Sequence, residues 1–412
     1  MTTLGSPGST LQFASLWRRA ALESPLVSGG PTDQLMELLA QLLDWHRREE
    51  KSFWWNYFHL RDMTPEELTH DPSALGQLGA APELGRLDFL GRMPVPLRRP
   101  FKAGLDHAVA AHRAASGTDL ACCFLAGHEW YQPFDALPDA GAEVPGMLVT
   151  TLHHDLLAPE VLAHYTPTVP EALPVPLHPA CAQARLADPL GVFRVFSVVP
   201  FVFLVDESRL AGRPAPRCWA DLFDPIWADD IVIGGWRPNE QTPYQDFNSY
   251  LLLCLAQAFG LDALVAFAHN VRRLQHNIRT ARLAGSDSAS VGAIAILPWL
   301  QAELCPRRQR TRVVWPEDGA LAMPIASLVR HDAGQRVAPL FDYVHGDALA
   351  AVLNRNCYPS VGAHGAGFPA GARLRWPGWD YVRGHDFAAA GKRASSVFLS
   401  AWYAAHGECA CN

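Results

Sequence analysis

The sequence contains no apolar run near the roughly 18 residues that a membrane-spanning helix needs. The longest candidate, residues 196–205, is interrupted by a proline. The chain also has no GxSxG elbow, no Walker loop and no HExxH helix, which are signatures of common hydrolases and nucleotide-binding enzymes. We therefore expect a protein without a spanning helix that is not an enzyme.

Long blocks of lysine and arginine are also missing, and the formal net charge is −7. Both features argue against nucleic acid or an anionic membrane as the main partner and favour a small ligand. Arg18-Arg19 is followed by only three apolar residues before Glu23, so a secretory signal is not indicated. The sequence as written predicts a cytoplasmic protein, or a periplasmic or extracellular one if the true start lies upstream.

The nine cysteines include neither a CxxC pair nor a zinc-type Cys/His set. An odd number leaves at least one free thiol, which suits a reducing compartment, and Cys122-Cys123 is interpreted as core packing. With 412 residues, 49% of them hydrophobic, the chain can bury a large core and form two or three domains or lobes.

The first 84 residues are predicted to form a helical appendage. Leu35, Leu38 and Leu42 recur at helical spacing, and Thr64-Pro65-Glu66-Glu67 is a capping box. Residues 42–78 resemble a short segment of RecB-like nucleases, whose ExK motif is mimicked by Glu49-Glu50-Lys51. This triplet lies on a predicted helix, without the strand that a nuclease core requires, so the appendage is favoured over an alternative role as a nucleic-acid-associated protein or adaptor. The segment is a natural place for a homodimer contact.

From about residue 85 the pattern changes to strands, polar loops and helices in alternation. Residues 119–126 and 147–151 read as strands, and each is followed by a polar loop. Residues 193–206 form a long extended run, residues 242–259 a helix with Thr242-Pro243 at its start, and residues 291–297 another strand. This organisation predicts an α/β fold with a largely parallel sheet, in which ligands gather at the carboxyl ends of the strands.

Five motifs in order carry a resemblance to a known family. The motifs are Trp219-Ala-Asp-Leu with Asp224-Pro-Ile-Trp, then AIAILPWLQAEL, VVWPEDGALAMPIASLV, YPSVG and LRWPGWDYVRGHDF. They resemble motifs of the substrate-binding proteins of ABC transporters of the ferric-ion and polyamine type. The resemblance covers residues 88–402. It implies a two-lobed type II periplasmic-binding-protein-like fold, with residues 85–196 and 318–412 as lobe 1 and 197–317 as lobe 2. The two hinge crossings would be the extended runs near residues 196–205 and 310–324.

The function that this resemblance implies is solute capture. A small ligand binds between the lobes, the lobes close by hinge motion, and the protein delivers the ligand to an ABC permease or acts as a cytoplasmic sensor. Trp376 and Trp379 are expected to be packing anchors. The predicted ligand-binding residues are Gly127, His128, Glu129, His153, His154, Gln241, Thr242, Asn248, Asp287, Ser288, Glu317, Asp318 and Gly319.

Several of these residues have an equally simple structural interpretation. His153-His154 and Asp287-Ser288 would also suit solvated loops, and Gln241-Thr242 would suit a helix cap. Ferric-binding relatives use neighbouring tyrosines, and the sequence has no Tyr-Tyr pair. A metal ion held by His128, Glu129, His153 and Asp318 is chemically reasonable, because imidazole and carboxylate suit zinc, iron(II) or nickel. A metal chelate, an oxyanion or a small organic anion remains equally open, and no cofactor is expected beyond such a bound ion.

Overall fold

The computed structural model describes residues 84–406 except 126–133, 135, 136, 153, 168–175, 235–245 and 363–366. The chain forms two compact units. Unit 1 holds the described residues up to Thr150 with Ala163–Tyr165 and Val329–Tyr343, and unit 2 holds Thr151–Leu162, Thr166–Leu328 and the described residues from Val344. The predicted helical appendage and its dimer contact lie outside the described residues. The predicted lobe boundaries are not tested by this division and stay a prediction.

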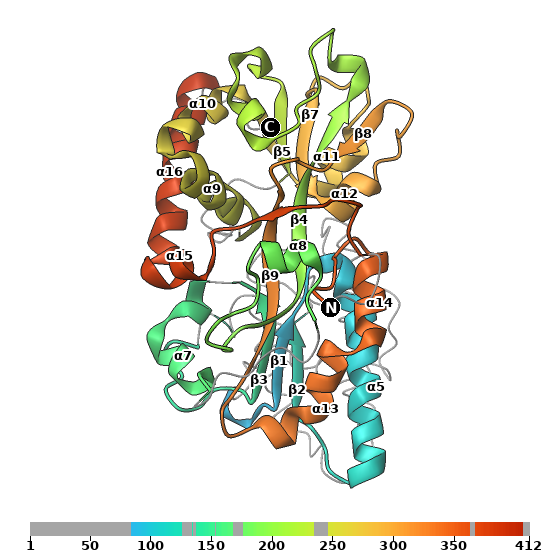
Figure 1. The fold of residues 1–412 in the computed structure, drawn as a ribbon, viewed down its shortest axis with the longest axis vertical. Helices are drawn as coiled ribbons and strands as arrows, with labels where there is room; N and C mark the ends of the chain where they lie inside the picture. The colour runs from blue at the N-terminus through green and yellow to red at the C-terminus, as the bar shows by residue number, and fades with distance from the viewer. Residues whose placement is uncertain are drawn as a thin grey trace, which may run out of the picture. The chain divides into compact units, whose positions relative to one another are not determined.

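Unit 1 is built on three parallel strands. β1 (Phe89–Arg92) lies between β2 (Cys122–Leu125) and β3 (Met147–Thr151), with Phe89 in register with both Cys122 and Met147 (Figure 1). The long helix α5 (Arg98–Ser116) packs its apolar stripe inward, and Phe101 stacks on Phe124 at 5.2 Å. Gly117 ends this helix in the left-handed conformation that glycine adopts most easily.

Unit 2 contains a further set of parallel strands of the same ten-stranded sheet. β5 (Ile231–Gly234) lies between β6 (Val271–Gln275) and β7 (Ile294–Pro298), and these three strands are parallel. The 13-residue β4 (Arg194–Asp206) runs antiparallel to β7, to β8 (Thr311–Val314) and to β9 (Ala320–Val329). The order of the sheet is β2-β1-β3-β9-β4-β7-β5-β6, with β8 paired to β4 and β10 (Leu374–Arg375) paired to β9. The two extended runs that the sequence assigned to the hinge crossings are therefore neighbours, because β4 and β9 pair directly.

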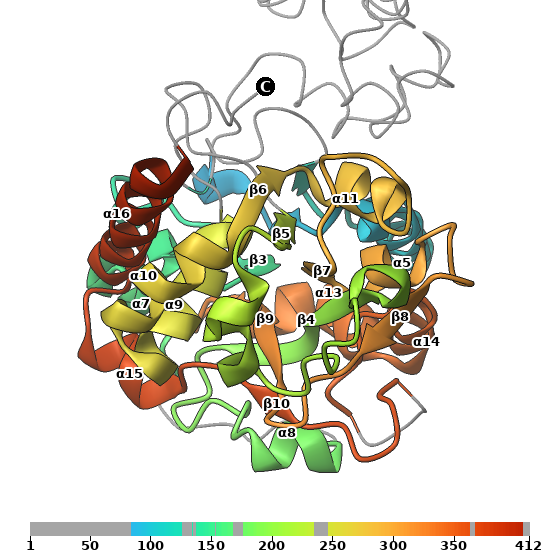
Figure 2. The same cartoon turned by 90° about the horizontal axis from the view of Figure 1, so that it is seen from above.

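Helices cover both faces of the sheet in unit 2. On one side lie α9 (Asp246–Phe259), α10 (Leu261–Asn270) and α16 (Phe387–His406), which contact one another (Figures 1 and 2). On the other side, α11 (Asn277–Leu283) and α12 (Trp299–Glu303) contribute alanines to a core with Val202, Leu204 and Leu297. The remaining helices and the last strand are α7 (Pro159–Tyr165), α8 (Pro179–Gln183), α13 (Gly334–His345), α14 (Asp347–Arg355), α15 (Trp379–Gly384) and β10 (Leu374–Arg375).

The structure confirms the predicted α/β organisation and the role of the C-terminal tryptophans. Trp376 donates from Nε1 to the carbonyl oxygen of Ala184 at 2.7 Å, and Trp379 to that of Leu186 at 3.2 Å. Both rings are nearly buried, so they act as packing anchors. Cys123 is buried as predicted, and burial raises the pKa of the Cys122 thiol to about 12 and that of Cys123 to about 11. These thiols are therefore protonated and unreactive at neutral pH.

Candidate ligand-binding site

Arg92 occupies the carboxyl end of β1 in unit 1. Its side chain is fully buried, its Nε donates to Thr150 Oγ1 of β3 at 2.6 Å, and its guanidinium carbon lies 4.6 Å from the centre of the Phe134 ring. Parallel strands end at one edge of a sheet, and ligands in open α/β sheets bind at that edge. An arginine stays charged in proteins, so this edge carries a fixed positive charge in a largely apolar setting.

The ligand residues predicted in this half of the chain follow strands of the same sheet in the sequence. Gly127, His128 and Glu129 come shortly after β2, and His153-His154 come directly after β3. Gly127, His128, Glu129 and His153 lie outside the described residues, and of His154 only the backbone is described. Their ligand role stays a prediction.

Sequence reasoning missed Arg92. The signal was a single charged residue that ends the short apolar run Phe-Leu-Gly-Arg before the proline-rich segment that leads into α5. Such a residue reads equally well as the first exposed position after a strand, because burial depends on what packs over it.

In unit 2, two amide side chains follow the carboxyl ends of the parallel strands. Asn277 comes just after β6 and Gln301 lies in α12, one turn after β7. Their carbonyl oxygens Oδ1 and Oε1 are buried without a hydrogen-bond partner in the described part of the chain. A buried unsatisfied acceptor costs about 1–3 kcal/mol, so this edge is suited to a ligand that supplies a donor.

Glycine at position 234, the last residue of β5, is required by this arrangement. A Cβ there would lie 2.1 Å from Asn277 Oδ1 and 2.5 Å from Leu297 Cδ2. The predicted residues Gln241 and Thr242 follow β5 and lie outside the described residues, and only the backbone of Asn248 in α9 is described. These three positions also stay predictions.

The corner between β8 and β9 contains the predicted residues Glu317, Asp318 and Gly319. The Asp318 carboxylate accepts from the backbone N–H of Trp219 at 3.3 and 3.4 Å and lies 3.8 Å from Arg375. Burial raises the pKa of Asp318, although the Trp219 N–H and the Arg375 charge act in the opposite direction. Trp219 Nε1 donates to the Gly319 carbonyl oxygen at 2.9 Å. Asp318 and Gly319 thus bond within unit 2.

Glycine is needed at 319 for two reasons. Its φ is 107°, in the region that side chains disfavour, and a Cβ there would lie 2.9 Å from the carbonyl carbon of Leu374. The corner was predicted to face a ligand cleft. What the structure shows for Gly319 is a close approach to the backbone of β10, and contact with a ligand remains untested.

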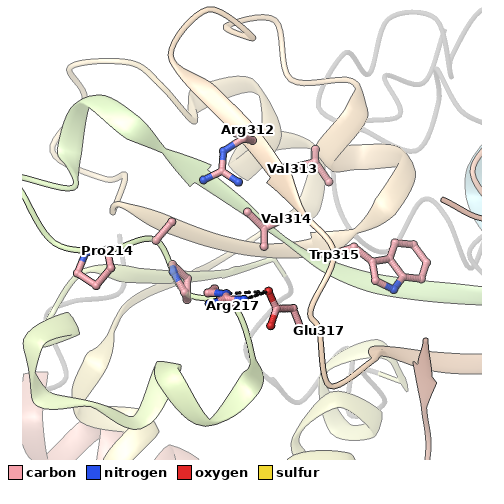
Figure 3. Close-up of a pocket in the computed structure, with 9 residues that line it drawn as sticks. Pro214, Arg217, Arg312, Val313, Val314, Trp315 and Glu317 are labelled. Atoms are coloured by element: carbon pink, nitrogen blue, oxygen red, sulfur yellow. Dashed lines mark hydrogen bonds and ion pairs between the residues drawn. The ribbon is translucent and has the colours of Figure 1, made fainter. Parts of the chain in front are cut away.

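Beside the corner is a pocket of about 540 Å³, drawn in Figure 3. It is formed by two segments of unit 2, residues 214–217 and β8 with the start of the corner. The lining residues are Pro214, Ala215, Pro216, Arg217, Arg312, Val313, Val314, Trp315 and Glu317. Glu317 is therefore the predicted ligand residue that the structure places in a pocket.

Asp287 and Ser288 lie elsewhere. They precede β7, at the amino edge of the parallel strands, where the Asp287 side chain is 94% exposed and pairs with Arg310 at 3.0 Å. Arg209 donates to the Ser288 carbonyl oxygen at 3.2 Å. The structure does not bring these two residues together with the carboxyl edge, and their ligand role stays a prediction.

The predicted metal site is mostly outside the described residues, since only Asp318 of its four members is described. Across the described ranges of 84–406, no group of three or more His, Cys, Asp and Glu side chains could hold a metal ion. The metal set of His128, Glu129, His153 and Asp318 therefore remains a prediction that rests on sequence.

A model of the family described as bacterial extracellular solute-binding protein matches residues 149–385. The chain belongs to this family. Its members are binding proteins, and the family is one of extracellular proteins. No curated protein matches the chain. Within the described residues, no helix is both long enough and apolar enough to cross a membrane.

Solved structures share the fold at low sequence identity. A Trichodesmium protein in complex with iron and citrate ligands has a TM-score of 0.54 and 13% identity over 76% of this chain and 98% of that one. The Bordetella ferric binding protein has a TM-score of 0.53 and 16% identity over 76% of this chain and 98% of that one. The apo ferric ion-binding protein A of Pasteurella haemolytica has a TM-score of 0.55 and 12% identity over 78% of this chain and 100% of that one. The two-lobed type II fold predicted from the motifs is confirmed. The nucleic-acid alternative drawn from residues 42–78 is not favoured.

Proposed function

We propose that this solute-binding protein captures a metal chelate or a small organic anion and delivers it to the permease of an ABC importer. Delivery is favoured over the sensor alternative because the family is extracellular. The observation that carries the ligand class is Arg92, a fully buried positive charge at the carboxyl edge of the sheet in unit 1. A carboxylate is the ligand group that suits a guanidinium best, because the two can share charge-assisted hydrogen bonds.

Three of the described tyrosines are committed to packing and do not suit a bare ferric ion. The hydroxyl groups of Tyr165, Tyr250 and Tyr343 donate to the carbonyl oxygens of Pro145, Ala322 and Phe101 at 2.7–2.8 Å. Burial raises the pKa of all three. A phenolate ligand must lose its proton, so these side chains are committed to packing. The Trichodesmium protein of similar fold, which is in complex with iron and citrate ligands, makes a ligand that combines iron with a carboxylate a reasonable candidate.

We keep the residues predicted at the two carboxyl edges as the proposed ligand contacts. In the first half of the chain these are Gly127, His128, Glu129, His153 and His154 beside Arg92, and in the second half Gln241, Thr242 and Asn248 beside Asn277 and Gln301. Considered separately, the arginine of the first set suits a carboxylate and the amide oxygens of the second set suit a hydroxyl donor, and a hydroxycarboxylate carries both kinds of group. No bond of the ligand is made or broken in this function.

The test is a binding panel on the chelator-treated protein: ferric citrate, citrate, ferric ion with a weak chelator, zinc, phosphate and a DNA duplex. A ligand at about 100 times its dissociation constant adds roughly 2.7 kcal/mol of stability, which shifts the melting temperature by several degrees. We expect a shift with the carboxylate ligands. A shift in melting temperature with DNA alone, and with none of the small ligands, would refute the proposal.

Two variants then test the role of Arg92 by calorimetry with the ligand found. Arg92→Gln should weaken binding by about 10-fold to 150-fold, since hydrogen bonds to charged groups contribute roughly 1.5–3 kcal/mol. The control is Arg336→Gln, which removes an arginine paired with Asp88 at the opposite, amino end of β1. Equal affinity in Arg92→Gln and wild type would move the ligand away from this edge.

A further inference from the structure

The pocket beside the corner exists because one of its walls cannot pair with the sheet. Among the described strands β8 pairs with β4, and its other side faces residues 214–217. Pro214 and Pro216 have no backbone N–H to donate to a neighbouring strand. The segment therefore stays apart from β8 until Glu317, whose N–H donates to the Arg217 carbonyl oxygen at 2.8 Å. The space between is about 540 Å³, within the range of small-molecule sites.

Charges of both signs line this pocket. Arg217 donates from Nε to Glu317 Oε1 at 2.7 Å, and the two side chains are 73% and 59% exposed. Arg312 donates from Nε to Glu207 Oε1 at 2.9 Å, with exposures of 53% and 52%. Exposed ion pairs contribute only about 0–1 kcal/mol, so a charged ligand can replace a partner at little cost.

The apolar lining lies between these charges. Arg312 and Val314 are two residues apart on β8 and share a face of the strand. Figure 3 shows Val314 between the Arg312 guanidinium and the Arg217–Glu317 pair, and Pro214 and Pro216 also line the pocket. A ligand that fits must therefore carry a negative group, an apolar body and a positive group. A dianion would face Glu317, and a dication would face both arginines.

We propose that this pocket binds a free α-amino acid with an apolar side chain, at a site separate from the carboxyl edges of the sheets. The ligand carboxylate accepts from Arg312, its ammonium group donates to Glu317, and its side chain packs against Val314 and Pro216. The pocket continues through Trp315 into the corner that leads to β9. This site does not depend on the ligand class proposed above, since none of its lining residues follows the carboxyl end of a parallel strand.

The test is calorimetric titration of the full chain with L-phenylalanine, with N-acetyl-L-phenylalanine and phenethylamine as probes that each lack one charge. We expect L-phenylalanine to bind, and each single-charge probe to bind at least about 10-fold more weakly, since the loss of one charged hydrogen bond is worth roughly 1.5 kcal/mol or more. Arg312→Gln and Glu317→Gln should each weaken L-phenylalanine binding by a similar factor.

The matched control is Arg310→Gln, which removes a similarly exposed arginine two residues before Arg312 whose partner, Asp287, lies outside the pocket. Its affinity for L-phenylalanine should equal that of the wild type. No binding of L-phenylalanine at 10 mM would overturn the proposal, where this concentration is about 100 times a weak site's 0.1 mM dissociation constant. Equal weakening in Arg310→Gln and Arg312→Gln, or equal affinity for the N-acetyl probe, would also overturn it.

Discussion

His345, at the end of α13, should make the stability of the protein depend on pH in the acid range. Its Nε2 lies 2.9 Å from Ser327 Oγ of β9, and its ring packs edge-to-face on Phe196 of β4 at 5.8 Å. Burial lowers the pKa of His345 to about 3, and the Arg194 charge acts in the same direction. The folded protein therefore keeps this imidazole neutral at pH values where the unfolded chain protonates it.

The sign and the size of the change in unfolding free energy with pH follow from this difference in pKa. The unfolded chain, with a histidine pKa of about 6.5, binds more protons than the folded protein between pH 6.5 and pH 3, so stability falls as pH falls through that window. Between pH 7 and pH 5 the loss from this one group is about 2 kcal/mol. His276, whose pKa burial lowers to about 4, adds a loss in the same direction. A comparison of variants is therefore needed to isolate His345.

The assay is urea unfolding of the wild type and His345→Gln at pH 7 and pH 5. The variant keeps a side chain that can bond Ser327 and removes the titration. Its loss of unfolding free energy over this interval should be about 2 kcal/mol smaller than that of the wild type. His107→Gln, which removes an exposed histidine of α5, serves as the control and should match the wild type. Parallel pH profiles for the wild type and His345→Gln would refute the assigned burial.

Two further predictions concern the corner. Gly319→Ala should destabilise the protein by about 1–3 kcal/mol in thermal or urea unfolding, because φ is 107° and the new Cβ would meet the Leu374 backbone. Gly334→Ala, where a Cβ meets nothing within 4 Å, should be near neutral, and equal effects of the two variants would contradict this reasoning. Trp219→Phe should cost about 1–3 kcal/mol by leaving the Gly319 carbonyl unpaired, although the ring can still pack on Phe203. An unchanged melting temperature in that variant would show that the bond contributes nothing.

The elements that sequence reasoning located well are those whose pattern is set locally. Residues 147–151 were predicted as a strand and form β3, because the run is apolar and bounded by a glycine and a polar loop. The helix predicted to stop before Gly260 does stop at Phe259, and Gly260 has a φ of 87°. The strand predicted at 291–297 begins only at Ile294, and the N–H of Ala293 before it donates to the Asp230 carboxylate at 2.9 Å rather than to a neighbouring strand.

What depends on tertiary packing was not predicted. β6, with the sequence Val-Arg-Arg-Leu-Gln, has a half-exposed edge position and no apolar alternation, so nothing in its composition marks it as a strand. Arg92 is fully buried only because neighbouring strands and Phe134 surround it. The candidate site therefore combines loop residues that are predicted from their sequence position with an arginine whose burial only the fold reveals.

The corner between β8 and β9 shows why two of the five sequence motifs occur together. Trp219 and Asp318-Gly319 are about 100 residues apart, yet Trp219 donates both its N–H groups to this pair. Asp221, two residues after Trp219, accepts from the backbone N–H of Arg217 at 2.7 Å and so fixes the segment that meets Glu317. The two motifs therefore form one hydrogen-bonded unit.

These hydrogen bonds restrict backbone rotation at the corner between β8 and β9. Backbone rotation at residues 317–319 would break the Glu317 N–H bond to Arg217 and both bonds of Trp219, and Ala320 N–H also donates to the Arg373 carbonyl oxygen at 3.0 Å. Gly319 therefore serves a fixed turn with positive φ beside the backbone of Leu374, and these contacts hold its backbone in one conformation. Closure of a two-lobed binding protein needs a few residues that absorb changes in φ and ψ, and from these bonds we expect such residues to lie outside 317–319, elsewhere in the predicted crossings.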